Sequence, residues 1–170
     1  MLGSLHRRDD GRFELRFERH LAHPLAKVWR AITDPEQLRA WFPAAVDMDP
    51  TMGAKLRIEL TPEAQARHAI PEEDMTSYGE VTAVDPPRLL EYTWSGEILG
   101  WELEPTADGC RLRLTNVLDD RAMAADDGAG WHVALEALGS ALDGREVDRL
   151  ALFDRADEMV GTYACHLGRG

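Results

Sequence analysis

The chain has 170 residues and a formal net charge of -12 at pH 7, and its two cysteines lie far apart in the sequence. This length suits a single domain whose core needs neither a metal nor a disulfide. The acidic charge argues against a nucleic-acid partner, because phosphate binding depends on clustered lysine and arginine. No apolar run approaches the roughly 20 residues that span a bilayer, so we expect a cytoplasmic protein without membrane insertion.

The first elements are a strand and two short helices. Residues 13–18 alternate apolar and charged side chains, which predicts an antiparallel strand with one buried face. Asp34 and Pro35 suit the N-cap and the first position of a short second helix. The helix before it is predicted from apolar residues at spacings of three and four, which are Leu25, Val28, Trp29 and Ile32.

The middle of the chain reads as strands. Short strands are predicted near residues 46–48 and 56–60, and a meander of four strands is predicted over 78–117. Residues 61–77 lack a period and read as a long loop or a short irregular helix. In the meander, alternation places two sets of residues inward, which are Leu90, Tyr92 and Trp94, and then Leu99, Trp101 and Leu103.

The C-terminal part is helical. A long helix is predicted from one apolar stripe over about three turns, formed by Trp131, Leu135, Leu138 and Leu142. Gly144 is a suitable stop, and residues 147–167 suggest a further amphipathic helix. The apolar face of that last helix would pack on the rest of the chain or on a second copy, which makes a homodimer one hypothesis.

These elements predict an α+β fold. A curved antiparallel sheet of about six or seven strands would wrap around the long helix, with the two short helices inserted between strands 1 and 2. We assign residues 1–170 to one domain, with 144–170 as an additional C-terminal helix. A space between such a sheet and its helix is a candidate binding site.

Several motifs together resemble the SRPBCC superfamily, in the branch homologous to the activator of the heat-shock-chaperone ATPase. They include Thr33-Asp34-Pro35, Trp41-Phe42, Gly79-Glu80-Val81, Tyr92-Thr93-Trp94 and Gly130-Trp131, and they cover about residues 13–142. The resemblance implies a START-like, pollen-allergen-like helix-grip fold over residues 13–143. It also implies a hydrophobic cavity under the long helix, used for lipids, polyketides and other hydrophobic small molecules, or for contact with a chaperone.

Aromatic residues are the strongest candidates for a ligand site. Tyr and Trp combine apolar area with a polar tip, and both suit a pocket wall as well as a core position. His132 and Glu136 lie one helical turn apart, so the imidazole would lie at a cavity wall or in a surface ion pair. The residues predicted to bind ligand are Tyr78, Tyr92, Trp94, Trp101, Trp131, His132 and Leu135.

Catalytic and cofactor motifs do not emerge from the sequence. We find no nucleophile elbow, phosphate-binding glycine loop or metal-ligand spacing, and we predict no catalytic residue, cofactor or metal. The carboxylates of Asp119, Asp120, Asp126 and Asp127 read as a solvated rim near a helix N-terminus. Arg19 follows the inward alternation of its strand, but we expect the strand end to turn it to water.

The leading hypothesis is a non-catalytic protein that binds a lipid-like, polyketide-like or aromatic molecule in the cavity. A cyclase or aromatase that moves protons through Tyr92 or His132 is the second hypothesis. A module that stimulates a heat-shock chaperone ATPase is the third. The lack of a second domain weakens the chaperone hypothesis, because the activator proteins of the family carry one.

Overall fold

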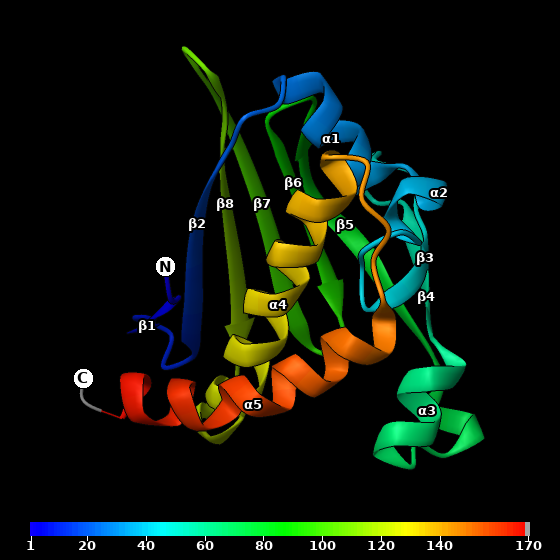
Figure 1. The fold of residues 1–170 in the computed structure, drawn as a ribbon, viewed down its shortest axis with the longest axis vertical. Helices are drawn as coiled ribbons and strands as arrows, with labels where there is room; N and C mark the ends of the chain where they lie inside the picture. Colours follow the sequence, from blue (N-terminus) through cyan, green and yellow to red (C-terminus); the bar gives the residue numbers. More distant parts are fainter. Residues whose placement is uncertain (169–170) are drawn as a thin grey trace.

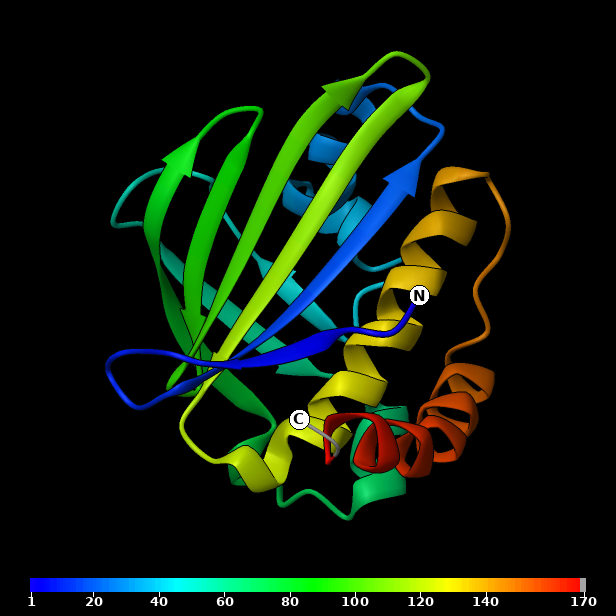
Figure 2. The same cartoon turned by 90° about the vertical axis from the view of Figure 1, so that its left-hand side faces the viewer.

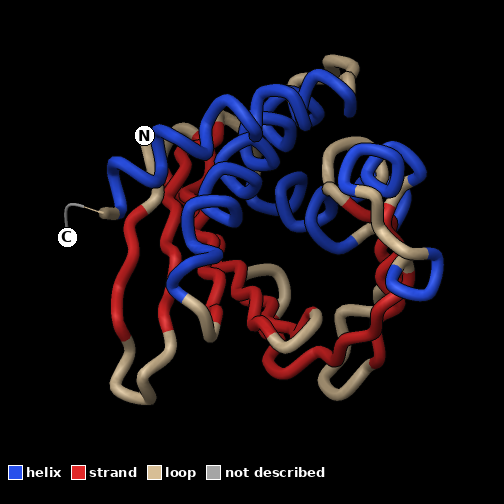
Figure 3. Tube along the Cα trace, turned by 90° about the horizontal axis from the view of Figure 1, so that it is seen from below, coloured by secondary structure: helices blue, strands red, loops and turns tan. Residues whose placement is uncertain are grey.

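The protein is built on one antiparallel sheet of eight strands, and the computed structural model describes residues 1–168. The order across the sheet is β1-β2-β8-β7-β6-β5-β4-β3, and the strands curve around the helices on one face (Figure 3). The strands are β1 (Ser4–Arg7), β2 (Phe13–Leu21), β3 (Ala44–Asp47), β4 (Lys55–Leu60), β5 (Thr76–Asp85), β6 (Leu89–Trp94), β7 (Glu97–Thr106) and β8 (Gly109–Leu118).

The predicted α+β helix-grip fold is confirmed, with one strand more than the six or seven expected. The additional strand is β1, which pairs with β2 from Ser4 opposite Arg16 to Arg7 opposite Phe13. Its four residues alternate too briefly to give a period-two signal. Backbone pairing at the sheet edge, rather than apolar burial, therefore defines this strand.

Two short helices follow β2, as predicted: α1 (Leu25–Thr33) and α2 (Pro35–Leu38). Asp34 caps α2 by accepting a hydrogen bond from the Glu36 backbone N–H at 2.9 Å. The Trp41 indole N–H donates to the Ala31 carbonyl at 2.9 Å and ties the end of this pair back to α1. This bond places Trp41 inside the core, as the sequence indicated.

The irregular segment between β4 and β5 contains the short helix α3 (Pro62–His68) and the 3₁₀ helix η1 (Glu72–Asp74). Thr61 caps α3 through a hydrogen bond from the Ala64 backbone N–H. At the other end of α3, Arg67 forms ion pairs with Asp154 at 2.7 Å and with Asp157. The segment is therefore a helix held against the C-terminal region rather than an open loop.

The long helix α4 (Ala124–Leu142), preceded by the 3₁₀ helix η2 (Arg121–Met123), lies across the concave face of the sheet (Figure 1). The last helix, α5 (Arg149–Leu167), crosses the lower end of α4, as Figures 1 and 2 show. Tyr163 of α5 is fully buried, and its hydroxyl accepts a hydrogen bond from the Gly3 backbone N–H at 2.9 Å. Part of the apolar face of α5 is thus used within the chain. Within residues 1–168, no helix is long and apolar enough to cross a membrane.

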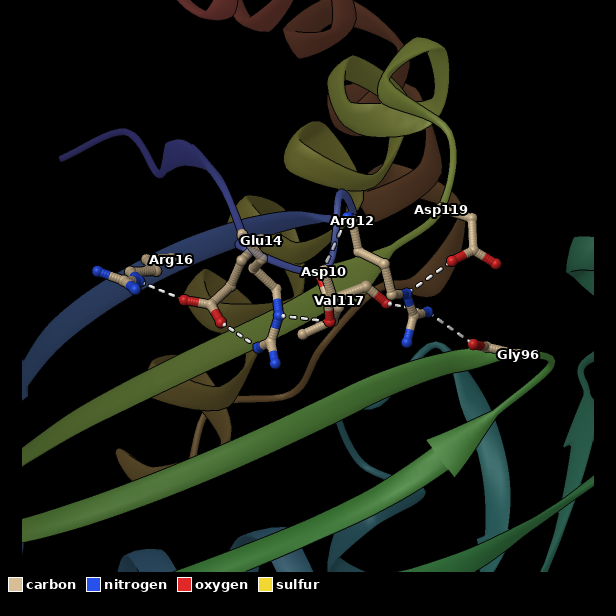
Figure 4. Close-up of polar contacts among 8 residues, drawn as sticks. Asp10, Arg12, Glu14, Arg16, Gly96, Val117 and Asp119 are labelled. Atoms are coloured by element: carbon tan, nitrogen blue, oxygen red, sulfur yellow. Dashed lines mark hydrogen bonds and ion pairs between the residues drawn. The ribbon is translucent and has the colours of Figure 1, made fainter.

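Arg12 joins three segments at the lower end of the sheet (Figure 4). Its guanidinium donates to the Gly96 carbonyl at 2.9 Å, and its Nε lies 2.6 Å from an Asp119 carboxylate oxygen. In the same β1–β2 hairpin, Glu14 forms ion pairs with both Arg8 and Arg16. Arg12 therefore anchors the turn between β6 and β7 through the Gly96 carbonyl. The residues on either side of Gly96, Ser95 and Glu97, line the pocket described below.

The contact between α4 and α5 gives a stability prediction. A Cβ on Gly128 of α4 would lie 2.6 Å from Cδ1 of Tyr163, so Gly128→Ala should displace α5 and lower the free energy of unfolding by about 1–3 kcal/mol. A Cβ on Gly139 meets no heavy atom within 4 Å, so Gly139→Ala should be neutral or stabilising by up to about 1 kcal/mol. Urea unfolding of both variants, followed by circular dichroism, checks the pair. Equal stability of the two would contradict this packing.

Candidate functional site

The middle of the space between sheet and helix is filled by side chains. Tyr92 and Trp101 are each 1% exposed, and the Trp101 indole N–H donates to the Tyr92 hydroxyl at 3.3 Å. The rings of Trp41 and Trp101 meet edge to face with centroids 5.9 Å apart. The central void expected from the sequence is therefore occupied by the core.

A pocket of about 380 Å³ remains at one end of this space, where the first turns of α4 face β6, β7 and the start of β5. Its apolar walls are Pro43, Leu60, Trp94 and Trp131, with Gly130 beside them. Its polar lining comprises Ser77, Ser95, Asp74, Glu97, Asp126 and Asp127. A smaller pocket of about 70 Å³ lies next to it under α5 and shares Pro43 and Gly130 with it.

The two pocket tryptophans end a chain of aromatic contacts that runs through the core. The ring centroids of Trp101 and Trp131 are 6.0 Å apart, and those of Trp131 and Trp94 are 6.4 Å apart. Phe42 packs against both pocket tryptophans, at centroid distances of 5.7 and 5.8 Å. The pocket is thus bounded by rings whose positions the core already fixes.

The indole N–H groups of both pocket tryptophans are satisfied inside the protein. Trp94 donates to the Ser77 hydroxyl at 3.1 Å, and Trp131 donates to the Asn116 side-chain oxygen at 3.1 Å. Asn116 is fully buried on β8, and its amide N–H in turn donates to Glu97 at 2.7 Å. The rings therefore offer their apolar surfaces to the pocket, while Asn116 holds a carboxylate beside them.

Two carboxyl groups of the pocket have raised pKa values. Burial raises the pKa of Asp127 from its ordinary 3.8 to about 7, and the neighbouring charges of Glu97 and Asp126 act in the same direction. Burial also raises the pKa of Glu97, although its hydrogen bond from Asn116 opposes this shift. Within residues 1–168, the buried Oδ2 of Asp127 has no hydrogen-bond partner. At neutral pH the site therefore holds a carboxyl group that exchanges its proton readily.

The structure brings two of the seven predicted ligand residues, Trp94 and Trp131, to the pocket. Tyr92, Trp101 and Leu135 lie in the buried core. The expectation that Tyr78 surrounds the interior is wrong, because its side chain is 69% exposed. On β5, Gly79 and Val81 are buried and share the inward face, so the alternation of the strand turns Tyr78 outward.

His132 lies on a different face of α4 and does not line the pocket. It is 7% exposed, its Nδ1 lies 3.0 Å from the Tyr163 hydroxyl, and its Nε2 lies 3.3 Å from Glu136. Burial, reinforced by the nearby charge of Arg19, lowers the pKa of His132. The contact with Glu136 expected from the sequence is present, but the imidazole is buried rather than at the surface, because Tyr163 of α5 packs on it.

Arg19 also differs from the prediction. The pairing of β2 with β8 continues without a bulge to Leu21, so the strand stays regular through Arg19. Its side chain follows the inward alternation instead of turning to water, and its guanidinium lies 3.4 Å from Nδ1 of His132. Burial lowers the pKa of Arg19.

The sequence analysis did not single out Asn116 or Glu97 as site residues, and it placed Asp127 in a solvated rim, whereas the Oδ2 of Asp127 is buried. Each occupies a position that an apolar pattern places inward. Asn116 continues the buried alternation of Leu112 and Leu114, and Glu97 continues that of Leu99 and Trp101. Asp127 lies one helical turn before Trp131 on α4. The sequence did carry a signal for these residues, which is a polar side chain at a position where the apolar pattern points inward. Buried polar groups need hydrogen-bond partners, so such a residue indicates a polar network or a site.

Solved structures with the same fold confirm the architecture. CalU16 from Micromonospora echinospora is 21% identical, with a TM-score of 0.69 over 96% of this chain and 94% of that one. The BPP1335 protein from Bordetella parapertussis is 27% identical, with a TM-score of 0.68 over 87% and 84%. DynU16, from the dynemicin biosynthetic locus, is 25% identical, with a TM-score of 0.63 over 78% of this chain and 48% of that one.

The sequence comparison identifies the family. No protein with a curated description matches the chain. Residues 22–143, from the end of β2 to the end of α4, match the family described as Activator of Hsp90 ATPase homolog 1-like protein. The helix-grip architecture, with its sheet curved around α4, agrees with the SRPBCC resemblance of the motifs. The chain therefore belongs to the Activator of Hsp90 ATPase homolog 1-like family, a branch of the SRPBCC superfamily.

Proposed function

We propose that this protein binds a small aromatic molecule in the pocket between Trp94 and Trp131. The observation that carries the proposal is a pocket of about 380 Å³ with two indole walls at the edge of an otherwise filled core. Small-molecule sites commonly enclose about 300–1,000 Å³ and combine apolar walls with a few polar groups. This pocket has that composition, and its volume suits a ligand of one or two fused rings.

The preorganised rings support an aromatic ligand over a flexible chain. Trp94 and Trp131 have their N–H groups bonded within the protein, so binding leaves no indole donor unsatisfied. Rings fixed by the core lose little side-chain entropy when a ligand packs on them. The similarity to DynU16, from a biosynthetic locus, also supports a small-molecule ligand over a chaperone partner.

A second candidate is an enzyme of the cyclase type, favoured by the carboxyl pair. Asp127 has a pKa near 7 and lines the pocket with Glu97, so it suits proton transfer to a bound molecule at neutral pH. Tyr92 and His132, which the sequence suggested for this role, do not line the pocket. An enzyme would therefore depend on Asp127, and Asp127→Asn would abolish turnover while binding persists.

The proposed binding is tested by NMR with indole as a neutral probe. In ¹⁵N-labelled protein, indole should shift the side-chain N–H signals of Trp94 and Trp131, while the signal of Trp29, which lines neither pocket described above, stays in place. Saturable shifts at the two pocket tryptophans support the proposal. Their absence at saturating indole would contradict it.

A matched pair of glycine variants controls this test. A side chain on Gly130 projects from α4 at the pocket without meeting a heavy atom within 4 Å of its Cβ. Gly130→Leu should therefore occupy the pocket and weaken indole binding at least tenfold. Gly139→Leu adds the same side chain to the same helix away from the pocket and should bind like the wild type. Equal effects of both variants would place the bound indole elsewhere.

Burial of the ionised Asp127 carboxylate lowers the free energy of unfolding, so the stability of the protein should depend on pH. The folded pKa of Asp127 lies above its unfolded value, so the free energy of unfolding decreases as pH rises from about 4 to 7. Asp127→Asn removes this penalty and should stabilise the protein at pH 8 by on the order of 2 kcal/mol, with no gain near pH 4. Urea unfolding at both pH values checks this difference. A gain that is independent of pH would refute the assignment.

A further inference from the structure

We infer that the aromatic ligand of this pocket carries a positively charged amine, held by Asp127 and Glu97 beside the indole walls. This inference rests on the proposed function and names the chemical class of the ligand. It follows from the charge of the lining, the absence of ion pairs at its carboxyl groups within residues 1–168, and the apolar surfaces of the two tryptophans.

The charged residues of the lining all have one sign. Asp74 comes from η1, Glu97 from β7, and Asp126 and Asp127 from the first turn of α4. Within residues 1–168, no lysine, arginine or histidine lines the pocket. Because the walls are apolar and partly exclude water, the field of these groups is focused into the pocket. An anionic ligand is repelled there, and a cation is attracted.

In the part of the chain that the structure describes, the carboxyl groups of the pocket also lack a positively charged partner in an ion pair. Among residues 1–168, Asp74, Asp126 and Asp127 form no ion pair, and the buried Oδ2 of Asp127 accepts no hydrogen bond. Glu97 accepts one bond, from Asn116. A partly buried carboxylate without a counter-charge is costly, and an ammonium group in the pocket would supply the opposite charge.

The helix dipole explains only part of this arrangement. Aspartates in the first turn of a helix are favourable in themselves, which accounts for Asp126 and Asp127 on α4. It does not account for Glu97 and Asp74, which approach the same pocket from other elements. The convergence of the four groups on one pocket therefore points to a ligand rather than to helix stability alone.

An organic cation fits this site better than a metal ion. Within residues 1–168, no group of three or more histidine, cysteine, aspartate or glutamate side chains is placed to hold a metal. The carboxyl groups instead line the same pocket as the two indoles, and an ammonium group within about 6 Å of an indole face gains a cation–π interaction. A ring that carries an amine would use both features at once.

Ionisation of Asp127 should couple binding to pH. The charged groups around it are Asp126 on its own helix, Asp74 from η1 and Glu97 from β7, with Arg12 beside Glu97 from outside the sheet. With a pKa near 7, about a tenth of Asp127 is ionised at pH 6 and about nine tenths at pH 8. A cation that binds the ionised form should therefore bind about tenfold more tightly at pH 8 than at pH 6.

Three probes that share one ring system test this inference by NMR titration of the full chain. Tryptamine carries an amine that, like that of lysine, stays protonated through pH 8, indole is neutral, and indole-3-acetate is an anion. We expect tryptamine to bind at least tenfold more tightly than indole at pH 8, and indole-3-acetate more weakly than indole. In Asp127→Asn, the tenfold pH dependence of tryptamine should disappear. In Asp85→Asn, an exposed control far along β5, it should remain.

The possible outcomes separate the two proposals. If indole and tryptamine bind with equal affinity at both pH values, the charged ligand is refuted and the aromatic pocket stands. If indole-3-acetate binds most tightly, the inference is also refuted. If none of the three probes shifts the signals of Trp94 and Trp131, the pocket itself is refuted, and with it both proposals. Because Asp127→Asn is expected to be more stable at pH 8, loss of its fold does not confound the titration.

Discussion

Asn116 is the residue on which the geometry of the pocket depends. It is fully buried on β8, accepts a hydrogen bond from Trp131 of α4 and donates one to Glu97 of β7. One side chain thus fixes the indole that walls the pocket and the carboxylate that charges it. Because a buried amide that loses either partner costs about 1–3 kcal/mol, helix and strand are held in one relative position. Trp131 and Glu97 are therefore held at the pocket by the protein itself.

The position of the pocket follows from how the core is filled. Tyr92 and Trp101 occupy the middle of the space between α4 and the sheet, and their polar atoms bond to each other. A ligand there would have to displace packed rings. At the first turn of α4 the packing ends, and two carboxyl groups with raised pKa values take its place. Groups whose pKa values are strongly shifted by burial and by neighbouring charges cluster at functional sites.

The sequence predicts the fold well because its apolar periods are strong. The stripe from Trp131 to Leu142 defines α4, and the alternation in β6 and β7 defines the central strands. β1 was missed because backbone pairing at an edge leaves little apolar pattern. The site was predicted less well. Trp94 and Trp131 were found from their ring type, but ring type does not separate a pocket wall from a core position. That distinction depends on where packing stops, which is a property of the folded chain.

The family match covers the main pocket but not the last helix of the chain. The matched region, residues 22–143, contains every residue that lines the main pocket, yet α5 lies outside it. α5 reaches the same end of the fold through Arg67 of α3, which pairs with Asp154, and through Phe153, whose ring meets His68 edge to face at 5.9 Å. The smaller pocket beneath α5 shares Pro43 and Gly130 with the main one. The matched region thus contains the indole walls and the carboxyl groups of this chain, while α5 closes the space next to them. Because α5 lines only the smaller pocket, a ligand would meet this helix only if it extended past Pro43 and Gly130, beyond the main pocket.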